Sequence, residues 1–154
     1  MANTMSAVFF ATLLALMMSG CDGESEPAVA FSHGWARATP TGANVAAVYA
    51  QLSNRGLESV TILGISTSVA RMAQVHETTE SEGMMRMRHV DPLALAAGTD
   101  VDLVPGGMHL MLMGLTQPLT SGMTFDVTFE LADGQKLTLP VVVGAVDQLE
   151  APAM

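Results

Sequence analysis

Cysteine is nearly absent from this chain of 154 residues, in which Cys21 is the only one. A folded domain that follows Cys21 therefore has no disulfide bond, no thiolate metal site and no Cys-x-x-Cys redox pair. Lys and Arg are also scarce, with 6 against 15 Asp and Glu, and the formal net charge is −9. So little positive charge argues against binding to nucleic acid, whose phosphates require a basic face. It equally argues against binding to anionic lipid by charge alone.

Aromatic residues make up only 5% of the chain, whereas methionine is abundant at 13 residues. Apolar residues reach 49%, which is enough for one domain with a hydrophobic core. Most methionines outside the N-terminal segment lie between Met72 and Met123, among His76, His89 and His109. Methionine is ordinarily a flexible core filler, so its placement beside histidine is the informative feature.

The N-terminal residues have the pattern of an export signal. Residues 6–18, SAVFFATLLALMM, are an uninterrupted apolar run that is too short to span a membrane. Two small residues then precede Cys21, which resembles a bacterial lipobox. We expect a lipoprotein signal peptide over 1–20, lipidation of Cys21 and a tether over 21–30. By resemblance to proteobacterial lipoproteins, Asp22 after the Cys implies retention at the inner membrane, facing the periplasm; simple cleavage to a soluble protein is the alternative.

The rest of the chain consists of short β-like segments separated by Gly and Pro turns, which is typical of an all-β sandwich or barrel. We expect a single domain over 31–143 and a short flexible tail over 144–154. A turn at 80–83 joins two strands, and residues 93–98 read as a connection with weak helical character. Strands are expected over 45–52, 59–65, 69–76, 84–90, 99–104, 108–112, 123–131 and 137–143.

One expected strand carries two potential metal ligands. Side chains alternate between the two faces of a strand, so His109 and Met111 share a face while Leu110 and Leu112 point the other way. His-x-Met on a strand therefore offers a ready pair of ligands.

The hairpin around the turn at 80–83 offers a second pair. A turn centred near Ser81 and Glu82 places His76 opposite Met87, or one residue off, and directly opposed Cβ atoms lie about 4.5–5.5 Å apart. Two imidazoles and two thioethers form a soft set that selects Cu(I) over harder ions. The four candidate ligands are His76, Met87, His109 and Met111.

The other methionines and histidines of this region are open to plainer interpretations. His89 shares the parity of Met87 and is either a spare ligand or an exposed strand histidine, and His33 stays unassigned. Trp35 is expected in the core or at its rim. We assign Met84, Met85, Met108 and Met113 to core packing.

No nucleophile and base stand at a recognisable spacing, so an enzyme is not expected.

The spacing of the four candidate ligands, H-x10-M-x21-H-x-M, resembles that of the PCu(A)C family of periplasmic copper chaperones. Further similarity lies in WARAT at 35–39, in Tyr49, in VHET at 75–78 and in PGGMHLMLMGL at 105–115. The resemblance covers residues 31–143.

This resemblance implies a cupredoxin-like Greek-key β-sandwich or barrel that binds one Cu(I) through His76, Met87, His109 and Met111. It also implies delivery of copper to an acceptor such as subunit II of cytochrome c oxidase, at the Cu(A) centre, with a thiol-based chaperone as a further partner. The tail has no histidine for a second copper site. Two alternatives stay open: a periplasmic copper sequestration or resistance protein, and a structural β-sandwich lipoprotein without metal.

Overall fold

The computed structural model describes residues 29–148, which form ten β-strands and contain no helix that could cross a membrane. The all-β prediction is confirmed. The expected signal peptide, Cys21 and residues 21–28 of the expected tether lie outside the described residues. The strands are β1 (Val29–Arg37), β2 (Val45–Asn54), β3 (Val60–Thr67), β4 (Ala70–Ser81), β5 (Met84–His89), β6 (Leu93–Leu95), β7 (Asp100–Leu103), β8 (Met108–Leu115), β9 (Thr124–Leu131) and β10 (Lys136–Gly144).

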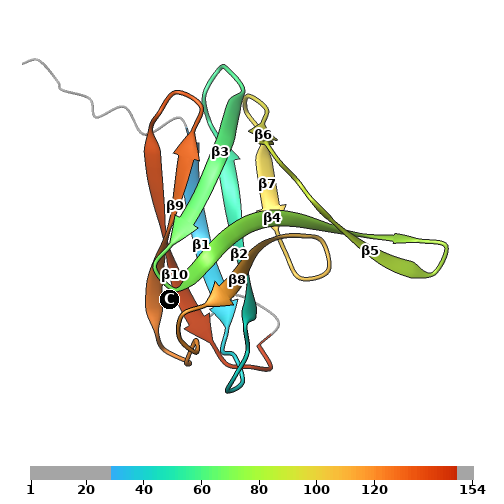
Figure 1. Ribbon diagram of the computed structural model, residues 1–154. Coiled ribbons are helices and arrows are strands. Elements are labelled where there is room, and N and C mark those ends of the chain that lie inside the picture. The colour runs from blue at the N-terminus through green and yellow to red at the C-terminus, as the bar shows by residue number, and fades with distance from the viewer. Residues whose placement is uncertain (1–28, 149–154) are drawn as a thin grey trace, which may run out of the picture.

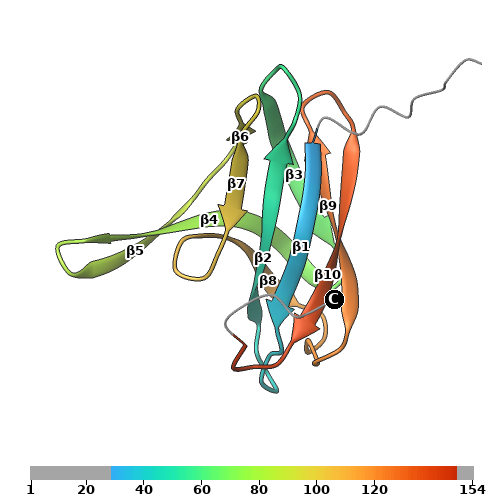
Figure 2. The ribbon, with the colours of Figure 1, turned by 180° about the vertical axis from the view of Figure 1, so that it is seen from behind.

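All ten strands belong to one sheet, in the order β5-β4-β8-β2-β1-β10-β9-β3-β6, with β7 paired to β2. The β1–β10 pair is parallel and every other pair is antiparallel. The sheet curls so that β3 and β4, which are distant in this order, lie beside each other in the barrel-like body (Figure 1). The tip of the β4–β5 hairpin projects from the body, and the view from behind shows the same projection (Figure 2).

The core lies inside the curled sheet, and period-two alternation decides which side chains enter it. In the β4–β8 ladder, Val75 pairs with Leu110 and both are buried. The next pair outward, His76 with His109, points to the opposite face because neighbouring residues on a strand alternate. Trp35 is buried against Tyr49, with ring centroids 4.7 Å apart, as expected for a core aromatic.

Several boundaries differ from the expectation: β4 continues to Ser81, past residue 76, and β10 includes Gly144, the first residue of the expected tail. Strand β1 begins at Val29, so the last two residues of the expected tether are part of the sheet. The expected helical character of residues 93–98 is wrong, because Leu93–Leu95 form β6, which pairs with β3. Leu93 and Leu95 are buried on either side of exposed Ala94, which is the period of a strand.

Candidate metal centre

The turn of the β4–β5 hairpin fixes which residues face each other across it. Glu82 and Gly83 both have positive φ, 55° and 75°, and Ser81 pairs with Met84 on either side of them. This is a two-residue hairpin loop, whose two central residues adopt left-handed conformations. The register of the whole hairpin follows from the position of this loop.

The register places His76 opposite His89 and places Met87 opposite Thr78. The prediction that His76 faces Met87, or lies one residue off, is therefore wrong by two residues. The error has a physical reason. The loop consists of Glu82 and Gly83, whereas the prediction centred the turn near Ser81 and Glu82, one position earlier. A Gly in the second loop position was the signal for the correct register.

His76 is the middle member of a row of three histidines on adjacent strands. In the β4–β8 ladder it pairs directly with His109, and in the β4–β5 ladder it pairs directly with His89. The ring centroids of His76 and His89 lie 5.6 Å apart, and those of His76 and His109 lie 6.3 Å apart. We call His89, His76 and His109 the histidine row.

His109 is held in one tautomer by the turn before β8. Its side chain is buried, and its Nδ1 donates to the carbonyl oxygen of Gly107 at 3.1 Å. A carbonyl oxygen only accepts, so Nδ1 carries the proton and Nε2 keeps a lone pair. This orientation of one ring nitrogen by a backbone carbonyl is typical of metal-binding histidines.

The position of Gly107 follows from the local sequence. Pro105 and Gly106 occupy the middle of a turn in which the Gly107 amide donates to the Val104 carbonyl at 3.1 Å. Gly106 has φ of 80°, as the third position of a type II turn requires, and Pro favours the second position. The same Gly107 carbonyl accepts the Thr78 amide at 3.2 Å, which ties the turn to β4.

His76 has a buried nitrogen without a partner. Its Nε2 lies 3.4 Å from the amide oxygen of Gln74, which accepts, so Nδ1 holds the free lone pair. Among the buried side-chain nitrogen and oxygen atoms of residues 29–148, this Nδ1 is the one that lacks a hydrogen-bond partner. Burial lowers the pKa of His76, and the neighbouring His89 and then His109 lower it further. The neutral imidazole that results is the form that binds metal.

The two candidate thioethers flank the histidine row on the same face of the sheet. Met111 pairs with Gln74 and is diagonal to His76 across the β4–β8 ladder. Met87 is diagonal to His76 across the β4–β5 ladder, on the other side of the row, and is 52% exposed. Diagonal neighbours in a sheet lie about 7–8 Å apart, which long side chains span. The structure thus brings His76 and His109 together and leaves Met87 at the periphery.

A sequence-family model described as "Putative lipoprotein LpqE-like" matches residues 29–143. The chain belongs to the LpqE-like family. A relative from Leifsonia xyli subsp. xyli, named "Putative lipoprotein Lxx21020", is 33% identical over 126 residues, which cover 81% of this chain and 74% of the relative.

Solved structures share the fold of this LpqE-like protein. The apo PCuAC domain of PmoF2 superposes with a TM-score of 0.70 at 22% identity, covering 81% of this chain and 96% of that domain. The solution structure of CuI-DR1885 from Deinococcus radiodurans has a TM-score of 0.64 at 29% identity, covering 86% of this chain and 87% of that one. The resemblance to the PCu(A)C family and the cupredoxin-like fold are confirmed.

The remaining methionines of this LpqE-like protein do not all pack in the core. Met108 packs against the core, and Met113 is half-buried opposite Met72. The expectation of core packing is wrong for Met84 and Met85, which are 52% and 63% exposed. The reason is the projection of the hairpin tip beyond the barrel, where no other strand of residues 29–148 covers either face (Figure 1).

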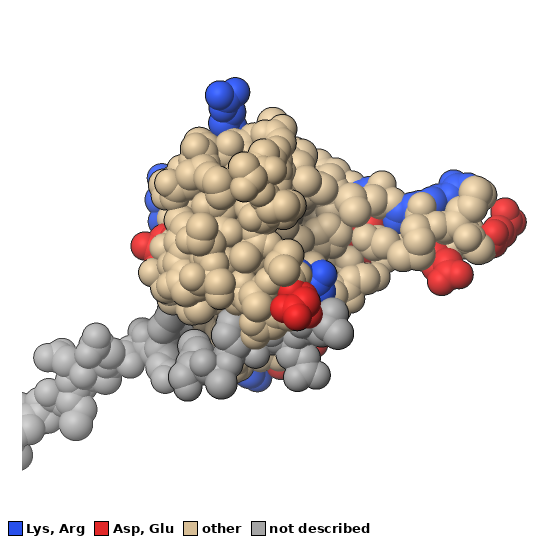
Figure 3. Space-filling model, turned by 90° about the horizontal axis from the view of Figure 1, so that it is seen from below, with Lys and Arg blue, Asp and Glu red and all other residues tan. Residues whose placement is uncertain are grey.

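The reverse face of the hairpin carries charge. Arg88 pairs directly with Glu77, and its Nη2 lies 2.6 Å from a carboxylate oxygen of Glu77. Both signs of charge gather on the projecting hairpin, while the surface of the body seen in the same view is mostly uncharged (Figure 3). A cross-strand ion pair of this kind supports the register by a few tenths of a kcal/mol to about 1 kcal/mol.

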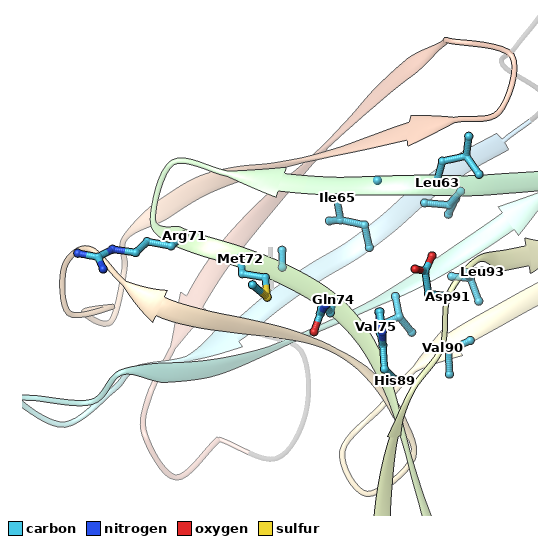
Figure 4. A pocket seen from close by; sticks show the side chains of 13 residues that line it. Leu63, Ile65, Arg71, Met72, Gln74, Val75, His89, Val90, Asp91 and Leu93 are labelled. Atoms are coloured by element: carbon cyan, nitrogen blue, oxygen red, sulfur yellow. The ribbon is translucent and has the colours of Figure 1, made fainter.

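A pocket of about 320 Å³ opens beside the histidine row, between β3 and β4. Gln74 and His89 both line it, together with Met72 and Asp91 (Figure 4). Among residues 29–148, no three His, Cys, Asp or Glu side chains form a ready metal site by themselves. A metal centre on this face therefore needs the thioethers or a turn of the histidine side chains.

Proposed function

We propose that this LpqE-like protein is an exported, non-enzymatic copper chaperone that binds one Cu(I) through His76, Met87, His109 and Met111. The observation that carries the proposal is the unpartnered, buried Nδ1 of His76, in a ring directly opposite His109. A buried polar atom without a partner normally costs about 1–3 kcal/mol, and a metal ion removes that cost. His109 offers its Nε2 lone pair from the neighbouring strand.

The types of donor on this face favour Cu(I) over other ions. Two neutral imidazoles and two thioethers are soft, uncharged ligands that suit Cu(I). Zn²⁺ prefers thiolate, imidazole and carboxylate, and the chain has no cysteine after Cys21. The solution structure of CuI-DR1885, which shares the fold at 29% identity, supports this choice.

Exposure of the centre suits transfer of the ion to another protein. Met87 is half exposed and His109 is buried, so the outer ligand can be exchanged while the inner ligand still holds the ion. The acceptor we propose is a copper enzyme such as cytochrome c oxidase, at the Cu(A) centre of subunit II, with a thiol-based chaperone as a further partner. The lipobox at Cys21 anchors the domain to the inner membrane, on its periplasmic side; the name of the relative from Leifsonia xyli, "Putative lipoprotein Lxx21020", supports a lipid anchor.

A competition titration against a Cu(I) chelator tests the site. The background variant is Cys21→Ser, because a thiol at position 21 would itself bind Cu(I). We expect one tightly held Cu(I) per chain, and a loss of affinity of about 100-fold or more in the His109→Ala, Met111→Ala double variant. Wild-type affinity in the double variant would refute the site.

Delivery and sequestration are separated by a genetic assay. A strain that lacks the protein is compared with strains that carry the wild type or the double variant, with and without added copper. Delivery predicts low cytochrome c oxidase activity in the deletion and double-variant strains, restored by added copper. Normal oxidase activity together with copper sensitivity would identify a sequestration protein instead.

A further inference from the structure

We propose that His89 is a third imidazole ligand of this centre and that it lets the centre hold Cu(II) as well as Cu(I). The inference rests on the proposed function, since it extends the copper site formed by His76 and His109. No electron transfer is implied: Cu(II) enters and leaves as Cu(II).

The position of His89 carries this inference. His89 is the direct cross-strand partner of His76, whereas Met87 is displaced by two residues along β5. The rings of His89 and His76 are 5.6 Å apart, closer than the 6.3 Å between His76 and His109. The register thus makes His89 the nearer β5 donor to His76.

The available nitrogens of the histidine row are compatible with a shared ion. His76, in the middle, presents its Nδ1, the nitrogen nearer the backbone. His109 presents Nε2, the nitrogen farther out, because its Nδ1 is bonded to Gly107. Adjacent strands lie about 4.8 Å apart. A nitrogen close to the backbone on the middle strand and nitrogens farther from the backbone on the two flanking strands can therefore meet at one point above His76.

His89 is free to make the adjustment that a shared ion needs. The three rings do not form a ready site as they stand, but His89 is exposed, and turning its ring costs only side-chain rotamer freedom. His89 also lines the pocket between β3 and β4 (Figure 4).

The chemistry of the ligands assigns the oxidation state. Thioethers select Cu(I), whereas imidazole nitrogens suit Cu(II), which favours tetragonal nitrogen and oxygen coordination. A centre with two imidazoles and two thioethers favours Cu(I). A third imidazole gives Cu(II) three nitrogen ligands, with water as a further ligand on the exposed side.

The test measures Cu(II) and Cu(I) binding separately, with copper(II) sulfate and with a Cu(I) chelator complex, in the Cys21→Ser background. Electron paramagnetic resonance of the Cu(II) protein counts coordinated nitrogens. In His89→Gln we expect the count to fall from three to two and Cu(II) affinity to fall about ten-fold or more, while Cu(I) affinity changes less than about three-fold. The control is His33→Asn, which removes an imidazole from β1, where Asn tolerates the φ of 56°.

Three results would overturn the inference. One is an unchanged nitrogen count and Cu(II) affinity in His89→Gln. Another is an equal loss of Cu(I) and Cu(II) affinity, which would mean that His89 only supports the fold of the hairpin. The third is absence of Cu(II) binding by the wild type. Each leaves the proposed function standing if Cu(I) is still bound, whereas failure to bind Cu(I) refutes the proposed function itself.

Discussion

His76 and His109 are direct partners in the β4–β8 ladder, and their ring centroids lie 6.3 Å apart. The two residues are far apart in the sequence, and the pairing of β4 with β8 brings them together. Each ring keeps a nitrogen lone pair. His109 donates through Nδ1 to Gly107, which leaves its Nε2 lone pair, and His76 donates through Nε2 to Gln74, which leaves its Nδ1 lone pair without a partner.

Removal of one thioether without loss of volume should weaken copper binding and leave the fold intact. Leu is close in size to Met, so Met111→Leu is expected to lower Cu(I) affinity about ten-fold or more and to change stability by less than about 1.5 kcal/mol. The matched control is Met113→Leu, on the same face and strand, which should bind as the wild type does. Equal losses in the two variants would show that copper does not distinguish Met111 from Met113.

The turn before β8 should control the tautomer of His109. Gly106 has φ of 80° with open space around it, so Gly106→Ala introduces backbone strain of about 1–2 kcal/mol without a steric clash. We expect a lower midpoint in a denaturant titration and a mixture of His109 tautomers in nitrogen NMR spectra. Gly106→Asn should be milder, because Asn tolerates this conformation. An unchanged tautomer in a destabilised Gly106→Ala variant would mean that the Gly107 carbonyl does not select it.

Acid should destabilise the apo domain through His76. Its pKa is lowered by burial and then by His89 and His109, so the folded state binds fewer protons at this site than the unfolded chain does. Stability from this group is therefore present above the unfolded value of about 6.5 and is lost as pH falls below it. An NMR titration should place the pKa of His76 below that value. In His89→Gln the pKa should move upward, and a downward shift would contradict the arrangement.

The hairpin register gives a prediction that needs no metal. Cross-strand nuclear Overhauser effects between backbone protons are expected for the pairs His76–His89 and Thr78–Met87. Directly opposed residues in an antiparallel pair have Cα atoms about 4.5–5.5 Å apart, close enough for such signals. Signals between His76 and Met87 in place of these would support the register that centres the turn near Ser81.

Much of the fold could be predicted from the sequence because β-strand alternation and turn chemistry are local. The segment 108–112 alternates clearly, so the shared face of His109 and Met111 follows from the pattern alone. The short strand Leu93–Leu95 cannot be predicted in this way, because three residues are too few for a reliable period.

The candidate site could be predicted only in part, because its assembly depends on long-range pairing. Nothing in the local sequence specifies that His76 lies opposite His109, since pairing between distant strands depends on the whole sheet. The sequence does not specify the position of His89 for a local reason: Glu82 adopts a positive φ, which is uncommon outside Gly, Asn and Asp. That loop shifts the register and brings His89, not Met87, opposite His76.

The ligands of the copper centre can be identified by X-ray absorption spectroscopy of the protein loaded with one Cu(I), in the Cys21→Ser background. We expect a Cu(I) edge and a first coordination shell that contains both thioether sulfur and imidazole nitrogen. The sulfur contribution should fall in Met111→Leu and stay unchanged in Met113→Leu. A shell of nitrogen and oxygen without sulfur, or a sulfur signal that survives replacement of both Met87 and Met111, would contradict the proposed ligand set.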